Sequence, residues 1–180
     1  SGEPVRFKME RCRVFVAESL SSSQALKRIL SGIETKYLLL FLGGQRITVE
    51  PEALERILER AESTKAGLVY SDFYDESKSG KALHPLNDYQ LGSVRDDFDF
   101  GAMVLYSVPA IRKALKNYSL MRDIKFAGLY DLRLKVSIDH SMYHVREPLY
   151  SVIRMNRSTR ENMFTYVDPR NKTIQKGMEI

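Results

Sequence analysis

The sequence has few of the features that form disulfides or anchor a chain in a membrane. It has one cysteine in 180 residues, Cys12, and no tryptophan. A single cysteine cannot form an internal disulfide, and a free cysteine that opens an apolar run is more often a core side chain than a nucleophile. No apolar run reaches the length of a transmembrane helix, and the first residues do not predict a signal peptide. We therefore expect a reducing, cytoplasmic setting.

The composition is that of a globular domain with an excess of positive charge. Hydrophobic residues make up 43% and charged residues 28%, and the formal net charge is +5. This balance excludes a disordered chain and a disulfide scaffold. We expect one domain over residues 8–153 and a basic extension over residues 154–180.

The basic extension raises the question of an anionic partner. Such a tail can contact phosphates, a membrane surface or nucleic acid, but it is more often a solvated surface. Aromatic residues are not interleaved with the basic ones as in an RNA-binding sheet. We therefore expect no nucleic-acid partner and leave open peripheral contact with the inner face of a membrane.

The fold prediction rests on the stretch from residue 36 to residue 75. Residues 37–42 form an apolar run without helical periodicity, typical of a strand that is buried on both faces, as in parallel sheets. Pro51 fits the first turn of a helix. Leu54, Ile57, Leu58 and Ala61 follow at the spacing of one helix face. Residues 67–70 form a second apolar run and predict a second strand.

The neighbouring segments extend this pattern. Residues 11–17 predict a strand, and the serines at 21–23 predict a helix cap. Residues 12–72 therefore predict the element order β-α-β-α-β. This order favours an α/β fold with a Rossmann-like, mostly parallel sheet flanked by helices. Further strands are expected at 100–106, 142–145 and 149–153, with a helix from Pro109 and a short helix around residues 129–136.

Ligands of such sheets bind beyond the carboxyl ends of the strands, so the residues there are candidate site residues. The candidates for cofactor binding are Gly43, Gly44, Gln45 and Ser71. Asp72 and Asp75 supply hard oxygen ligands that could hold Mg²⁺ or Mn²⁺ against a diphosphate. The alternative for both carboxylates is a solvated turn.

Residues 76–100 show neither helical nor strand periodicity, and long loops of this kind are often functional. Asp96, Asp97 and Asp99 lead into the strand at 100–106. Three carboxylates this close repel one another unless a cation, a sugar hydroxyl or a basic side chain binds them. These three aspartates are the candidate catalytic residues. His84 has no second histidine or cysteine nearby in the sequence and is interpreted as a surface residue.

The order of these segments resembles family 2 glycosyltransferases of the GT-A fold. The similar stretches are 37–42 (YLLLFL), 51–55 (PEALE), 67–72 (GLVYSD), 100–107 (FGAMVLYS), 130–134 (YDLRL) and 147–150 (EPLY). The combination of 96–101, 126–134 and 166–171 looks closest to a glycosyltransferase-like group of Bacteroides-type bacteria. The resemblance covers about residues 12–172 and implies a GT-A-like sheet whose first strand-helix unit is missing.

The resemblance implies sugar transfer from a UDP- or GDP-linked donor to a glycan acceptor in bacterial surface polysaccharide synthesis. In the family, a metal on the DxD carboxylates neutralises the donor diphosphate, and a carboxylate deprotonates the acceptor. Here the DxD place reads Gly43-Gly44-Gln45, and the place of the base falls on Gly128-Leu129. Either the other carboxylates supply the chemistry, or the domain is a non-catalytic sugar- or nucleotide-binding scaffold, or a missing segment completes the site.

Overall fold

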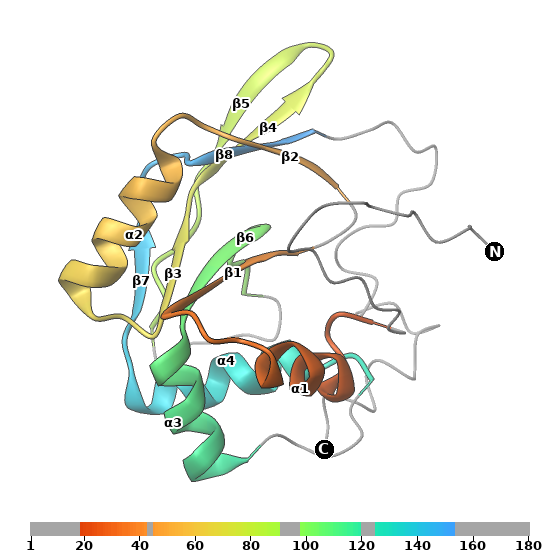
Figure 1. The fold of residues 1–180 in the computed structure, drawn as a ribbon. Helices are drawn as coiled ribbons and strands as arrows, with labels where there is room; N and C mark the ends of the chain where they lie inside the picture. Colours follow the sequence, from red (N-terminus) through yellow and green to blue (C-terminus); the bar gives the residue numbers. More distant parts are fainter. Residues whose placement is uncertain (1–18, 43–44, 91–97, 120–124, 154–180) are drawn as a thin grey trace.

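The computed structural model describes residues 19–42, 45–90, 98–119 and 125–153 of the chain (Figure 1). Several sequence-based expectations fall outside these ranges: the strand at 11–17 with Cys12, the glycines Gly43 and Gly44, the carboxylates Asp96 and Asp97, and the extension at 154–180. In the described part, no helix is both long and apolar enough to cross a bilayer.

Four helices and eight strands make up the described part. The helices are α1 (Ser23–Ser31), α2 (Ala53–Thr64), α3 (Val108–Tyr118) and α4 (Gly128–Asp139). The strands are β1 (Tyr37–Phe41), β2 (Arg46–Val49), β3 (Leu68–Ser71), β4 (Phe73–Ser77), β5 (Gly80–His84), β6 (Met103–Ser107), β7 (Met142–Val145) and β8 (Tyr150–Ile153).

The prediction of a mostly parallel, Rossmann-like or GT-A-like sheet is wrong. The strands form two mixed sheets of four, with the orders β1-β6-β3-β7 and β2-β8-β4-β5. In the first sheet, β6 lies between β1 and β3 and runs antiparallel to both, so that only β3 and β7 pair in parallel. In the second sheet, only β4 and β8 are parallel.

The physical reason for the error lies in what a continuous apolar run indicates. β3 is buried at every position, and so is β6 except for its last residue. Burial on both faces follows from a central place between two layers of helices. It does not depend on strand direction, so an antiparallel central strand has the same sequence pattern as a parallel one.

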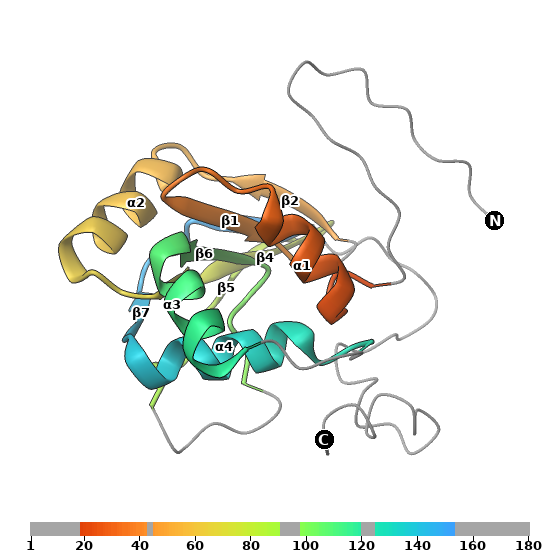
Figure 2. The ribbon, with the colours of Figure 1, turned by 60° about the horizontal axis from the view of Figure 1, so that its bottom comes forward.

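The first sheet is the middle layer of three. One of its faces packs on α1, α3 and α4 through a cluster that includes Leu26, Ile111 and Leu132. The other face packs on α2 through a cluster that includes Ile57, Val69 and Met103. Figure 2 brings α1, α3 and α4 forward, and α2 lies apart from them at the upper left. Alternation along each strand supplies both faces: in β6, Val104 and Tyr106 belong to the first cluster, and Met103 and Leu105 to the second.

The helix termini follow their sequence signals. The Ser22 side chain accepts a hydrogen bond from the Ala25 N–H at the start of α1, as a serine cap does. The Ser107 side chain accepts one from the Ala110 N–H at the start of α3, where Pro109 occupies the first turn. The predicted helices after Ser21-Ser22-Ser23 and from Pro109 are thus confirmed.

The predicted inner face of α2 is only partly correct. Ile57 and Ala61 are buried, but Leu54 is 48% exposed and Leu58 39% exposed. Ala53 is buried in their place, so the inner face runs through residues 53, 57 and 61. The helix therefore lies on the sheet through small side chains and one isoleucine, and its two leucines border the contact.

The second sheet contains elements that the sequence did not predict. The supposed loop after residue 76 includes a hairpin of β4 and β5, in which Ser77 pairs with Gly80 around a two-residue turn. Gly80 has φ +124°, a backbone conformation that glycine adopts readily. β2 pairs with β8. The hairpin extends away from the helices at the top of Figure 1.

Candidate functional site

Asp72 occupies the corner at which the chain passes from one sheet to the other. It is the single residue between β3 and β4. Its backbone N–H donates to the Val145 carbonyl (3.2 Å), and its carbonyl accepts from the Leu149 N–H (3.2 Å). Val145 is the last residue of β7, and Leu149 directly precedes β8, so both partners lie where the chain passes from β7 to β8 alongside the passage from β3 to β4. The candidate metal ligand is therefore fixed at its main chain on both sides, and the residue is only 6% exposed.

The Asp72 carboxylate begins a chain of polar contacts. Its Oδ1 accepts a hydrogen bond from the Leu86 N–H at 2.7 Å and lies 2.8 Å from His144 Nε2. His144 Nδ1 lies 2.8 Å from Asp88 Oδ1, and Asp88 also binds the guanidinium of Arg146. Because each ring nitrogen of His144 faces a carboxylate oxygen, a ring that is protonated on both nitrogens satisfies both contacts. This network ties residues 86–88 to β7.

Asp88 has a strongly lowered pKa in this network. Its hydrogen bond to Arg146, followed by the one to His144, lowers the pKa of the Asp88 carboxyl to about 2. The carboxylate is therefore charged at any ordinary pH and holds Arg146 and His144 on the same side of the β7 terminus.

A second polar group lies around His84. Its Nδ1 is 3.0 Å from Asp75 Oδ2, and its Nε2 is 4.0 Å from Asp99 Oδ2. The ring stacks on Phe73 with a centroid distance of 4.3 Å. Asp99 also accepts the Gly101 N–H through Oδ1 at 2.7 Å. A candidate metal ligand and a candidate catalytic residue are thus brought to opposite sides of one histidine.

Tyr150 packs beneath both polar groups. Its ring stacks on Phe73, on which His84 also stacks, and its hydroxyl accepts the Ala102 N–H at 2.7 Å. Burial raises the pKa of Tyr150, and the charges of Asp99 and Asp72 raise it further. The phenol therefore stays neutral and acts as a fixed support for the segment between Asp99 and β6.

The other sequence-based candidates have diverse placements. The Ser71 side chain is buried, and its hydroxyl donates to the Asp72 carbonyl at 3.0 Å. Gln45 is exposed just before β2. Asp72 and Asp75 engage different histidines, and the described residues hold no group of three or more His, Cys, Asp or Glu arranged to bind a metal.

Sequence reasoning missed the histidines and their partners. His84 was interpreted as a surface residue, but its side chain is 35% exposed and lies between two carboxylates. No sequence pattern indicated Asp88 or Arg146, and His144 was not among the predicted site residues. A signal for His144 existed, because a histidine inside a short apolar strand needs polar partners. Its partners lie 56 and 72 residues away along the chain and become neighbours only on folding.

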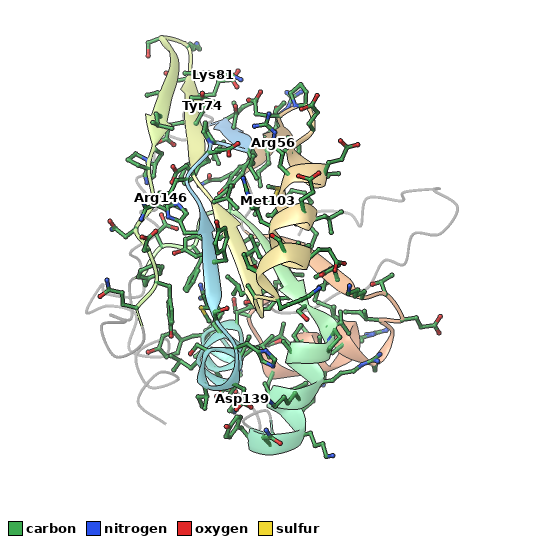
Figure 3. All side chains as sticks on the ribbon, turned by 90° about the vertical axis from the view of Figure 1, so that its left-hand side faces the viewer. Arg56, Tyr74, Lys81, Met103, Asp139 and Arg146 are labelled. Carbon is green, nitrogen blue, oxygen red and sulfur yellow. The ribbon has the colours of Figure 1, made fainter. Side chains whose placement is uncertain are left out.

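A cavity of about 550 Å³ lies beside this network. Its walls include Asp88 and Tyr89 on one side, the β7 residues, and Arg60 of α2 on the other side. In Figure 3, β7 runs through the middle of the view, with Arg146 near its end and α2 to its right. The volume lies within the range of small-ligand sites.

The two histidine groups have different chemical capacities. The Asp75–His84 pair resembles a base with an orienting carboxylate, because Asp75 engages Nδ1 and leaves Nε2 toward Asp99 and solvent. The Asp72–His144–Asp88 group has both ring nitrogens engaged, so its chief effect is to hold the chain.

No known family model matches this sequence, and a search of curated proteins finds no match.

Proposed function

We propose that the chain is a glycosyltransferase-like domain that takes a UDP- or GDP-linked sugar and transfers it to a glycan acceptor in bacterial surface polysaccharide synthesis. Two things support the proposal: the ordered resemblance of its sequence motifs to family 2 glycosyltransferases, and the group of ionisable side chains at the sheet corner. The single observation that carries it furthest is the placement of His84 between Asp75 and Asp99.

In this proposal, the His84 group accepts the proton of the acceptor. The acceptor oxygen forms a bond to the anomeric carbon, and the bond from that carbon to the diphosphate oxygen breaks. The nucleoside diphosphate leaves with the electron pair, and the acceptor proton passes to His84 Nε2 or to Asp99. Asp75 orients the ring through Nδ1. A positioned base of this kind contributes about 10²- to 10⁴-fold to the rate.

The proposed transfer step does not depend on a divalent cation. Asp72 Oδ1 already faces two donors, the Leu86 N–H and His144, and Asp75 faces His84. These carboxylates do not form a joint ligand pair in the described residues, so no step of the transfer is assigned to a metal. Binding of Mg²⁺ or Mn²⁺ together with a nucleotide remains a proposal for the experiment below.

The proposal is tested by calorimetric titration of UDP, GDP and several UDP-sugars, with and without Mn²⁺, followed by an assay of donor hydrolysis and transfer. We expect saturable binding of one nucleotide class. We also expect turnover that falls about 100-fold in His84→Gln, because the proton acceptor is lost. Asp139→Asn is the matched control, since Asp139 ends α4 far from the sheet corner (Figure 3). Absence of binding for every nucleotide would contradict the proposal.

A second candidate is a binding domain without turnover. It is favoured by the extent to which the polar groups bond one another: Asp72 faces two donors, and the Ser71 hydroxyl is used inside the corner. The same titration separates the two. Nucleotide or sugar binding without hydrolysis or transfer supports the scaffold, and measurable turnover that depends on His84 rules it out.

A further inference from the structure

β7 has an open edge in the described part of the chain. It ends the first sheet and pairs there only with β3. The Ser141 and Val145 carbonyls accept hydrogen bonds from the β3 side, from the N–H groups of Gly67 (2.9 Å) and Asp72 (3.2 Å). Main-chain groups alternate in direction along a strand, so the N–H and C=O groups of Met142 and His144 point to the open edge.

A groove follows this edge. The cavity of about 550 Å³ is lined by all four β7 residues and continues past Arg146. Tyr143 packs on the α2 side of the sheet, whereas Met142 packs on the opposite side, where His144 stacks on Tyr70. The groove therefore runs along a strand edge, with α2 on one side and residues 88–89 on the other.

The charges in the groove are unequal. Asp88 is engaged by Arg146 and His144, and Glu147 Oε2 accepts a hydrogen bond from Arg56 at 2.6 Å. Arg60 lines the groove from α2 and has no ion pair or side-chain hydrogen bond among the residues that the structure describes. An unpaired guanidinium next to compensated carboxylates favours an anionic occupant on the α2 side.

We propose that the β7 edge binds an extended acidic peptide segment of a partner protein, which adds to the sheet as a fifth strand. The outward N–H and C=O groups of Met142 and His144 bond the main chain of the peptide, as in other cases of strand addition. Four β7 residues at about 3.3 Å each give an edge of about 13 Å, which a segment of four to six residues covers.

The side chains of the added strand alternate between two environments. Every second one points to the α2 side, where Arg60 is available for a carboxylate. The others point to the side of Met142 and Tyr89, where Asp88 is already paired with Arg146 and His144, so apolar residues fit there. The preferred segment therefore alternates acidic and apolar residues. This inference is independent of the proposed sugar transfer, because it uses neither His84 nor Asp99.

Charge argues for this occupant over a second copy of the chain. Two β7 edges paired about a two-fold axis would bring the unpaired Arg60 residues of both copies toward one seam, and like charges that face each other destabilise a strand pair. A small phosphate ligand would satisfy Arg60 but would leave most of the strand edge unpaired.

The test is fluorescence anisotropy with the full chain and a labelled hexapeptide of alternating glutamate and valine. We expect saturable binding with a Kd below about 1 mM. A peptide with lysine in place of glutamate, and one N-methylated at the nitrogens that face β7, should each bind about tenfold more weakly or worse. Arg60→Glu should weaken binding to a similar degree, whereas Lys113→Glu on the exposed side of α3 should leave it unchanged.

Met142→Pro removes one outward N–H at the first residue of β7, where proline is tolerated, and Met142→Leu keeps it. We expect only the proline variant to lose affinity. If that variant fails to fold, the N-methylated peptide tests the same bond on the unaltered protein. Any of four results would overturn the proposal. These are absence of saturable binding, equal binding by the Arg60→Glu variant, full competition by inorganic phosphate, and a dimer that Arg146→Glu strengthens.

Discussion

Gly101 shows at the residue scale how tightly the segment before β6 is fitted. Its φ is +73°, and a Cβ at this position would collide with the Tyr150 hydroxyl. That hydroxyl in turn accepts the Ala102 N–H, so the tyrosine cannot move away without leaving a main-chain donor unsatisfied. Glycine at position 101 is thus required both by the backbone conformation and by the neighbouring side chain.

Gly101→Ala should lower the free energy of unfolding by about 2–4 kcal/mol, through backbone strain and the collision together. Chemical denaturation measures the change. Gly80→Ala is the matched control, because Gly80 also has positive φ but open space where the added Cβ would lie, and this variant should lose less unfolding free energy. Equal losses in the two variants would show that the Tyr150 contact is unimportant.

Asp88 gives the clearest prediction of pH dependence. Its pKa is lowered from 3.8 to about 2, first by Arg146 and then by His144. A depressed folded-state pKa means that the stabilisation is fully present above the unfolded value and is lost as the pH falls through the folded value. NMR titration of the Asp88 carboxyl should give a midpoint near 2. In Arg146→Gln the midpoint should rise, and an unchanged midpoint would contradict the ion pair.

At the scale of elements, the residues of α2 that helical periodicity predicts to be buried differ from those that pack on the sheet. Residues 54, 57, 58 and 61 share a broad helix face, but only part of that face meets the sheet. Ile57 is fully buried against the sheet, and Leu54 is about half exposed. The small residues Ala53 and Ala61 line the contact on either side of Ile57.

Truncation of these side chains should therefore have unequal effects. Ile57→Ala removes a fully buried side chain and should cost about 2–5 kcal/mol of unfolding free energy. Leu54→Ala, on the same helix, should cost less than about 1 kcal/mol. Urea denaturation of both variants measures the difference. Similar losses would mean that α2 is rotated relative to the contact described above.

At the scale of the whole molecule, Asp72 connects the two sheets. β3 continues into β4, and β7 into β8, across the same corner. The core cluster on the α2 side includes Val69 of the first sheet and Val152 of the second. Because the two sheets share a core and a corner, we expect them to unfold together.

Asp72→Ala should test this connection. The substitution leaves the Leu86 N–H and His144 without their carboxylate and should cost about 2–4 kcal/mol. With no tryptophan in the chain, tyrosine fluorescence and far-UV circular dichroism can follow unfolding. The two signals should give one common transition, at lower denaturant concentration than in the unaltered protein. Asp139→Ala serves as the control, and separate transitions in the unaltered protein would contradict a shared core.

The described elements differ in how well sequence could predict them. The helices that follow Ser22 and Ser107 were predicted correctly, because caps and helical periodicity are local signals. The hairpin of β4 and β5 was missed because its strands are short and largely polar, and because β4 is stabilised by pairing with β8, which is distant in the sequence. The His144 group was missed because its members come from distant segments, and the Asp75–His84 pair because the hairpin that brings these residues together was not predicted.

The sequence by itself determined which of the described segments are helices, that the apolar runs of β3 and β6 become buried strands, and that carboxylates follow β3. The apolar run at residues 37–42 was predicted to be buried on both faces, but β1 is an edge strand in which only Leu40 is buried. These features depend on side-chain patterns within about ten residues of one another. Only the tertiary structure decided the direction of β6 between β1 and β3, the division into two sheets at Asp72, and the pairing of Asp75 and Asp99 through His84. Strand direction and long-range pairing depend on how the layers pack, and a buried run looks the same in either direction.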